Sequence, residues 1–344
     1  MKIYTIRDIA EMAGVSVTTV SRVLNNRPDV SAETVKKVQR VMQECHFVVN
    51  PNARGLKQAD QEIIAVIIRG RNNPFLNALA EEIALCKRSD KAAMITEYID
   101  EEADEFRHAL GLLRGRRVAG LIFVGSRMDE RCAVLDGISL PMVFATVSTV
   151  GTPMERASSV SMDDRKMACE AVTALLKRGH RKIAVFGGER TGQDSLALRA
   201  RGAEDAFQAM GLSFEDERYI KTRLTLSDAY AAALDYFRRF PDATAAFCMG
   251  DTAALGVIRA LKDLGLKVPE DVSVMGVDGT DIGRYTTPRL STVAQPVREI
   301  ARQSVKVLSD LMENGGPPKH VTVKASLEIR ESVSEARQMS GRPA

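Results

Sequence analysis

The hydrophobic pattern of the chain changes near residue 62. Before that point, apolar residues recur every three or four positions within short segments, as amphipathic helices require. After it, short apolar runs alternate with longer amphipathic stretches. Strand-like runs occupy 63–68, 92–98, 120–125, 141–146, 158–163, 182–188, 245–250 and 272–278, and helical stretches occupy 75–89, 102–115, 164–178, 197–211, 227–239 and 252–265. This alternation predicts an α/β body with parallel sheets covered by helices, and so many strands favour two doubly wound subdomains over one sheet.

The first segment with a distinct motif is residues 5–25, TIRDIAEMAGVSVTTVSRVLN. Thr5 and Ser16 are predicted to cap two short helices, and Gly14 supplies the turn between them because glycine accepts a positive φ. A glycine turn followed by a second helix rich in Ser, Thr and Arg predicts a helix-turn-helix, which lays that helix in the major groove of DNA. The spacing alone is equally compatible with an ordinary αα-hairpin.

Two further segments precede the body. Ser31 is predicted to cap a third helix that extends to Phe47. Asn50-Pro51 then opens NPNARGLKQ, a stretch of about two helical turns that contains Gly55. Isolated helices shorter than roughly 12 residues are marginal in water. This stretch is therefore predicted to be helical only when something holds it, as a conditional hinge would be.

Composition and charge narrow the class of protein. The 344 residues exceed one ordinary core, so two or three domains are expected. Residues 1–57 hold nine basic and five acidic residues, a net charge of +4, whereas the remaining 287 residues sum to −1. A basic head on a neutral body favours a DNA-binding module attached to a sensor, although a solvated surface could give the same count.

Candidate cofactor, metal and membrane features are weak. The five cysteines and four histidines are scattered without CxxC or metal-ligand spacing, so we expect reduced thiols and no metal site. No GxGxxG or GxxxxGK[ST] follows a strand, which disfavours a nucleotide-dependent enzyme and predicts no cofactor. No apolar run approaches the roughly 18 residues of a membrane span. The start MKIYTIRD lacks an apolar secretory core, so we expect a cytoplasmic protein and no membrane partner.

Ordered stretches spread over the chain to about residue 333 resemble the LacI/GalR (lactose/galactose repressor) family. Besides residues 5–25 and NPNARGL, they are NNPFL (72–76), LLKRGHRKIAVFGG (175–188), RARG (199–202), GDTAALGVIRALKDLGLKVPEDVSVMGVDG (250–279), LSTVAQP (290–296) and SLEIRES (326–332). The resemblance implies a helix-turn-helix headpiece and a periplasmic-binding-protein-like body of two doubly wound parallel-sheet subdomains. It also implies a transcriptional regulator, in the first place a repressor, rather than an enzyme; a secreted solute-binding protein would have a secretory signal and no DNA-binding head.

The resemblance implies the following division of the chain. The domains are expected at 1–48 (helix-turn-helix), 49–60 (hinge), 61–161 plus 292–323 (N-terminal subdomain), 162–291 plus 324–333 (C-terminal subdomain) and 334–344 (polar tail). A homodimer on a pseudo-palindromic operator is expected, because one head reads too few base pairs. The apolar helix around 75–86 and the segment SLPMVFA (139–145) are the expected dimer interface.

The resemblance also implies which residues contact double-stranded DNA. Val17, Thr18 and Arg22 would read base edges, and the hinge residue Leu56 would enter the minor groove. The remaining members of the set are Thr5, Ser16, Thr19, Ser21, Asn25, Asn50 and Ala53. Packing is the alternative for Val17, a structural role for Thr19, and burial in an ordinary linker for Leu56. The family's proline before the hinge is replaced by Val49.

The expected effector is a small polar molecule bound between the subdomains: a sugar, sugar acid or sugar phosphate. Arg199 and Asp278 match the family's hydroxyl-binding arginine and carboxylate, and their alternative is a salt bridge to each other or between subdomains. Phe75 would stack on a sugar ring, or belong to the core instead, with Asn73 nearby. Arg71, with Arg69, would select an anionic effector unless both are solvated.

One departure from the family pattern affects this site. Many relatives read C-A-N-D where this chain has Cys248-Met249-Gly250-Asp251, so the amide that usually meets the ligand is absent. Asp251 is expected to be structural, at the start of the next helix.

Overall fold

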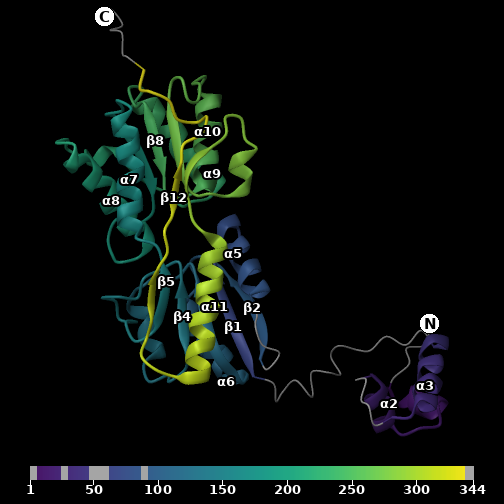
Figure 1. Ribbon diagram of the computed structural model, residues 1–344. Coiled ribbons are helices and arrows are strands. Elements are labelled where there is room, and N and C mark those ends of the chain that lie inside the picture. Colours follow the sequence, from purple (N-terminus) through teal and green to yellow (C-terminus); the bar gives the residue numbers. More distant parts are fainter. Residues whose placement is uncertain (1–5, 25–29, 46–61, 87–91, 338–344) are drawn as a thin grey trace, which may run out of the picture. The chain divides into compact units, whose positions relative to one another are not determined.

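The computed structural model describes residues 6–24, 30–45, 62–86 and 92–337. The chain divides into two compact units, 1–61 and 62–344, which are described separately (Figure 1).

The first unit holds three short helices: α1 (Ile6–Met12), α2 (Val17–Leu24) and α3 (Ala32–Glu44). Gly14, between α1 and α2, has a φ of +58°. Ser16 Oγ accepts a hydrogen bond from the Thr19 amide at 3.0 Å, and Ser31 Oγ accepts one from the Thr34 amide at 3.3 Å. The predicted glycine turn and both serine caps are thus confirmed.

A small apolar core joins these three helices. It consists of Ile9, Ala10, Ala13, Val20, Val23, Val38 and Val41. Because successive helix positions are about 100° apart, Thr18 lies opposite the buried Val20 and Val23, and Val17, at the edge of their stripe, is 41% exposed. The second helix therefore presents a face that the unit's own core does not use.

The second unit contains two six-stranded sheets. The first sheet has the order β11-β5-β4-β3-β1-β2 and the second β12-β10-β9-β8-β6-β7. The strands of the first are β1 (Ile63–Arg69), β2 (Ala93–Ile99), β3 (Val118–Val124), β4 (Met142–Ala145), β5 (Ser158–Ser161) and β11 (His320–Thr322). Those of the second are β6 (Ile183–Gly187), β7 (Tyr219–Lys221), β8 (Ala245–Cys248), β9 (Ser273–Asp278), β10 (Ser291–Ala294) and β12 (Ser326–Glu328). All neighbours are parallel except β10 and β12, as predicted for a doubly wound fold.

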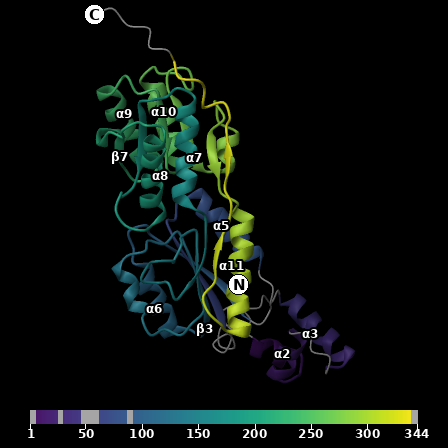
Figure 2. The same cartoon turned by 60° about the vertical axis from the view of Figure 1, so that its left-hand side comes forward.

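Helices cover both faces of each sheet. The first sheet packs against α5 (Pro74–Leu85) and α11 (Val297–Asn314) on one face and against α6 (Glu105–Gly115) on the other. The second packs against α7 (Asp164–Lys177) and α8 (Ser195–Ala209) on one face and against α9 (Leu226–Arg239) and α10 (Asp251–Asp263) on the other. Figures 1 and 2 show the two layered subdomains stacked end to end.

The chain passes between the subdomains three times, and one predicted boundary is wrong. The passages follow β5, β10 and β11. The boundary predicted at 291/292 would place most of β10 in the N-terminal subdomain, yet Ser291–Ala294 pair with Met275–Asp278 of β9. Residues 292–294 therefore belong to the C-terminal subdomain, because ladder hydrogen bonds bind them to its sheet.

Several elements were missed by the hydrophobic pattern. The strands β7, β11 and β12 have three residues each, too few to show a period, and β10 has four. The 18-residue α11 did carry a signal, since Ile300, Ala301, Val305 and Leu308 recur at helical spacing and are buried.

Two expectations about the surface are also corrected. The predicted polar tail begins at 334, but Ser334 donates from its amide to Ser273 Oγ at 3.0 Å and Ala336 to the Arg178 carbonyl at 2.8 Å. Residues 334–337 are therefore tied to the C-terminal subdomain. Of the expected interface segments, β4 is buried throughout and belongs to the core, whereas α5 packs its apolar side on its own sheet but leaves Leu85 78% exposed.

Candidate nucleic-acid interface and effector cavity

The exposed face of α2 carries the residues predicted to read bases. Val17 is 41% exposed, and Thr18 and Arg22 are exposed as well. Packing is thus the wrong alternative for Val17 within the described unit. Thr19 is held by Ser16 through both its amide and its hydroxyl, the latter at 2.8 Å. This pair supports the structural alternative for Thr19, since its polar groups serve the helix cap.

Part of the predicted DNA-binding set cannot be placed. Thr5, Asn25, Asn50, Ala53 and Leu56 lie outside the described residues. Their roles stay predictions.

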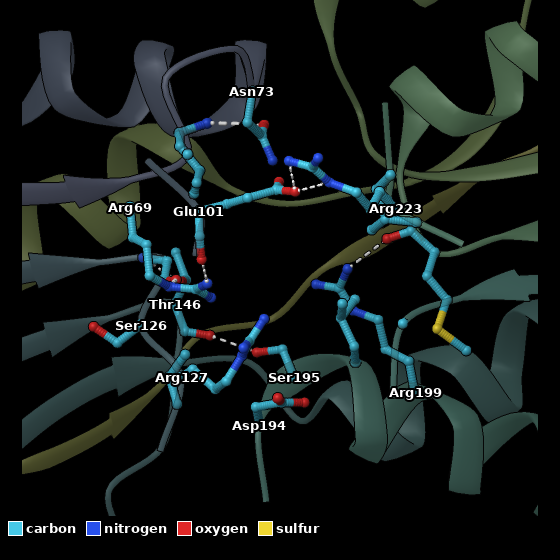
Figure 3. A pocket seen from close by; sticks show the side chains of 18 of the residues that line it. Arg69, Asn73, Glu101, Ser126, Arg127, Thr146, Asp194, Ser195, Arg199 and Arg223 are labelled. Carbon is cyan, nitrogen blue, oxygen red and sulfur yellow. Dashed lines mark hydrogen bonds and ion pairs between the residues drawn. The ribbon is translucent and has the colours of Figure 1, made fainter. Parts of the chain in front are cut away.

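A cavity of about 520 Å³ lies between the two subdomains (Figure 3). Its walls come from the loops that follow β1, β2, β3 and β4 on one side and β6, β7, β8, β9 and β10 on the other. The carboxyl ends of parallel strands are the usual ligand position in doubly wound sheets, because the loops there diverge and leave a crevice. A cavity of this size, lined by arginine and carboxylate side chains, suits a small polar molecule.

Two predicted residues reach the cavity from α5. Asn73 caps that helix, its Oδ1 accepting from the amides of Phe75 at 3.0 Å and Leu76 at 3.3 Å, so its amide nitrogen is the group left for a ligand. Phe75 is 4% exposed and packs in the core of the N-terminal subdomain while one side lines the cavity. The core alternative and the cavity position both hold for Phe75.

The prediction for Arg71 is corrected. Arg71 is exposed and is absent from the described residues that line the cavity; its carbonyl accepts from Asn77 Nδ2. Arg69 does line the cavity, but the protein itself engages its guanidinium, which donates to the carbonyls of Gly125 at 2.9 Å and Glu101 at 2.6 Å. The alternation of side chains along a strand applies to Arg69, the last residue of β1. Arg71 lies beyond the strand end, where the path of the loop decides which way its side chain points.

Arg199 is buried in the wall formed by α8. Its Nε donates to Asp164 Oδ1 at 2.7 Å, and its Nη1 donates to the Met249 carbonyl at 2.8 Å. Asp164 is buried too, and burial raises its pKa although Arg199 opposes this. Among the described residues no ion pair joins Arg199 to Asp278, so the mutual salt bridge is the wrong alternative. Arg199 is anchored by α7 and still borders the cavity.

Asp278 ends β9 and is 7% exposed, with a φ of 118°. A positive φ is uncommon for a residue with a side chain and often marks a functional position. Its Oδ1 accepts from Gln295 Nε2 at 2.7 Å. Burial raises the pKa of Asp278 to about 8, against the opposing charge of Arg199 and with help from the Asp251 carboxyl. The cavity therefore contains a carboxyl group whose charged form a ligand's hydrogen-bond donors would stabilise.

The residues around Asp278 bear out the structural role of Asp251. Asp251 is fully buried and accepts from the amide and hydroxyl of Thr280 and from Thr292 Oγ1. A Cβ added at Gly250 would lie 3.5 Å from Asp278 Oδ2, an ordinary contact. Gly250 therefore has room for a methyl group between Leu224 and Asp278.

Sequence reasoning missed most of the lining residues. Polar examples are Arg127, Thr146, Ser195 and Gln295. Their places next to strand and helix ends are the signal that identifies them. Arg127 and Thr146 follow the ends of β3 and β4 by three residues or fewer, and Ser195 begins α8. Gln295 directly follows β10, a strand that the pattern did not reveal.

A pair of glycine substitutions tests the Asp251 network. Gly276→Ala would place its Cβ 2.3 Å from Asp251 Oδ1, whereas Gly250→Ala meets only ordinary contacts at 3.4 Å or more. We expect the first to lower the free energy of unfolding by about 3 kcal/mol, since it displaces a buried carboxylate from its donors. The second is expected to change it little. Urea unfolding followed by circular dichroism measures both, and equal stabilities would contradict the network.

The described residues show neither a metal-ligand cluster nor a membrane-spanning helix. No group of three or more His, Cys, Asp or Glu in them could hold a metal ion. No helix in the described part of the chain is both long enough and apolar enough to cross a membrane.

Comparisons with known proteins agree with this architecture. Residues 5–50 match the model for bacterial regulatory proteins of the lacI family, and residues 155–333 match the periplasmic binding protein-like domain. The transcriptional regulator MalR of Clostridium butyricum is 33% identical over 95% of this chain and 98% of its own length. Catabolite control protein A of Priestia megaterium is 31% identical over 90% of this chain and 92% of its own.

Solved structures resemble the whole chain. A complex of the regulator CelR with cellobiose has a TM-score of 0.72 and 26% identity, covering 96% of this chain and 99% of the other. The Lac repressor dimer bound to operator and an anti-inducer has a TM-score of 0.75 at 24% identity, which shows the shared fold. A DNA-binding head joined to a two-subdomain sensor defines a ligand-responsive transcriptional regulator. The chain belongs to the LacI family of these regulators.

Proposed function

We propose that this regulator is a repressor that binds a pseudo-palindromic operator as a homodimer. A small sugar-like effector lowers or raises its operator affinity. The observation that carries this proposal is the polar cavity, in which Arg199 and Asp278 border one space between the subdomains. Together they offer cationic donors and a carboxyl acceptor, which suit a ring of hydroxyl groups. The cellobiose bound to CelR supports the same class of ligand.

The exposed face of α2 supports the DNA-binding half of the proposal. Val17, Thr18 and Arg22 offer a methyl contact, a hydroxyl and a guanidinium to the base edges, while Ser16 and Ser21 lie close enough on the helix for phosphate contacts. The Lac repressor dimer bound to operator supports this mode of binding. A protein that acts on chromosomal DNA in this way works in the cytoplasm and needs no catalytic group.

An exposed apolar patch supports dimerisation. Ile282 and Tyr285 are 55% and 79% exposed, and Leu327 and Ile329 of the neighbouring β12 segment are also exposed. Large apolar side chains gathered on one surface mark protein interfaces. This patch is a second candidate interface beside α5, whose Leu85 is 78% exposed.

Two measurements test the proposal. A thermal-shift screen of neutral sugars, sugar acids and sugar phosphates is expected to reveal at least one stabilising compound, which should change operator affinity in fluorescence anisotropy. If no such compound alters DNA binding, the sensor half of the proposal fails.

Arg22→Ala tests base reading. We expect a loss of about 1–3 kcal/mol on the operator and a flattened preference at one base position, because guanidinium groups bond guanine edges bidentately. Lys37→Ala, on the exposed side of α3, is the matched control and should weaken specific and random DNA alike. Equal losses on both DNAs for Arg22→Ala would exclude base readout by that side chain.

A further inference from the structure

The arginine side chains that line the cavity differ in their hydrogen-bond and ion-pair partners. Arg69 is largely buried, and besides its two carbonyl acceptors it lies 3.8 Å from Glu105, a carboxylate that is almost fully buried. Burial lowers the pKa of Arg69, and Glu105 opposes this. Arg69 thereby joins three separate loops of the N-terminal subdomain, those after β1, β2 and β3.

One of those loops reaches the other subdomain. Glu101 follows β2, and its carboxylate pairs with Arg223, which follows β7 of the C-terminal subdomain (Figure 3). The side chains are 33% and 55% exposed, so the pair lies at the solvent edge of the cavity. The backbone carbonyl of the same Glu101 is the group that Arg69 holds at 2.6 Å.

A second contact crosses the cavity further along its wall. Ser195 Oγ, at the start of α8, donates to the Thr146 carbonyl at 3.1 Å. Thr146 has a φ of 82°, so its carbonyl is presented by an unusual backbone conformation. Two contacts therefore join the subdomains across the cavity, one between Glu101 and Arg223 and one between Ser195 and Thr146.

We propose that Arg69, Glu101 and Arg223 form a latch, with Arg69 as its positioning residue, that favours the closed arrangement of the two subdomains before an effector binds. The latch regulates the effector site and so rests on the proposed function. A ligand shifts a conformational equilibrium only through its different affinity for the two states. The latch sets the starting point of that equilibrium.

The chemistry of the latch limits its strength. Glu101 and Arg223 are exposed enough to be screened by salt, and such pairs are individually weak. The latch therefore biases the subdomains without locking them, and its removal should raise the population of the open state by about two- to fivefold.

Hydrogen–deuterium exchange of the effector-free full-length protein tests this. The readout is the amide exchange of segments 146–149 and 195–198, which line the cavity or adjoin it and do not contact Glu101 or Arg223. We expect Glu101→Gln and Arg223→Gln to speed exchange there by about two- to fivefold at low salt. Arg259→Gln is the matched control, because it breaks an exposed pair with Asp263 on α10 and should leave these segments unchanged.

Three further outcomes decide the mechanism. Arg223→Lys keeps the positive charge opposite Glu101 and should keep exchange close to that of the parent, whereas Arg223→Gln should not. About 0.5 M NaCl should speed exchange in the parent but not in the Gln variants. Arg69→Met should speed exchange without adding to the effect of Glu101→Gln, because Arg69 acts by positioning Glu101 through its backbone carbonyl. Parent-like exchange in the Gln variants, or exchange in Arg223→Lys as fast as in Arg223→Gln, overturns the latch.

The design separates this inference from the proposed function. Exchange is measured without effector, so a normal latch in a protein that no sugar stabilises would refute only the sensor role. Sugar binding with unchanged exchange in the variants would refute only the latch.

Discussion

Asp278→Asn is expected to make the effector-free protein more stable above neutral pH and to remove much of its effector response. The burial that raises the pKa of Asp278 to about 8 means that the folded state holds this proton more tightly than the unfolded chain. Between the unfolded value near 3.8 and about 8, the unfolded chain ionises first, so stability falls as pH rises. Asparagine carries no charge and tolerates the positive φ at this position.

The expected stability difference can be measured by urea unfolding from about pH 5 to pH 8. We expect the free energy of unfolding of Asp278→Asn to exceed that of the parent by a margin that grows with pH and reaches about 2 kcal/mol at pH 8. Asp281→Asn, an exposed carboxylate three residues further along, is the control and should follow the parent. A constant difference across this range would mean that Asp278 titrates normally.

The same titration predicts how effector affinity depends on pH. Sugar hydroxyls donate best to an ionised carboxylate, so binding should favour proton release from Asp278. Affinity of the parent for the best compound of the thermal-shift screen should therefore rise from about pH 6 to pH 8. Asp278→Asn should bind about 10- to 100-fold more weakly at pH 8, with a flat profile. Its operator binding without effector should be close to that of the parent.

Arg199→Met is expected to destabilise the body by about 3–5 kcal/mol, because it leaves Asp164 buried without its cationic partner. Both side chains of this pair are almost completely buried, so water cannot replace the lost guanidinium. Arg165→Gln is a matched control on the same two helices. It breaks the exposed pair of Arg165 with Asp205 and should leave the unfolding midpoint unchanged.

A compensating change identifies the cause of that loss. Asp164→Asn combined with Arg199→Met removes the buried charge together with its partner and should recover a large part of the stability. Chemical unfolding of the parent, both single variants and the double variant gives the coupling directly. A double variant as unstable as Arg199→Met would show that packing of the guanidinium, rather than its charge, stabilises this wall.

The fold could be predicted well from local patterns. Long strands such as β1 and amphipathic helices such as α9 have enough residues for their periods to appear. The caps at Ser16 and Ser31 were predictable because the bonds they form span only three residues. The three-residue strands β7, β11 and β12 were not, because three residues are too few to show an alternation.

The cavity was predictable only in part. Arg199 and Asp278 were identified through the family resemblance, and both border the cavity. Arg71 was chosen together with Arg69, but only Arg69 turns inward, and no local rule distinguishes two arginines that flank a glycine at a strand end. Arg127 was missed since its place on the wall depends on the path of the loop after β3.

By itself, the sequence determined the helix-turn-helix, the alternation of strands and helices, and the class of regulator, because these rest on near neighbours and on ordered motifs. Only the tertiary structure decided which residues distant in sequence contact one another. Asp164, 35 residues before Arg199, became its partner because α7 packs against α8. Glu101 met Arg223 because two sheets bring their strand ends to one cavity. Such contacts depend on distances across the fold, which no local period encodes.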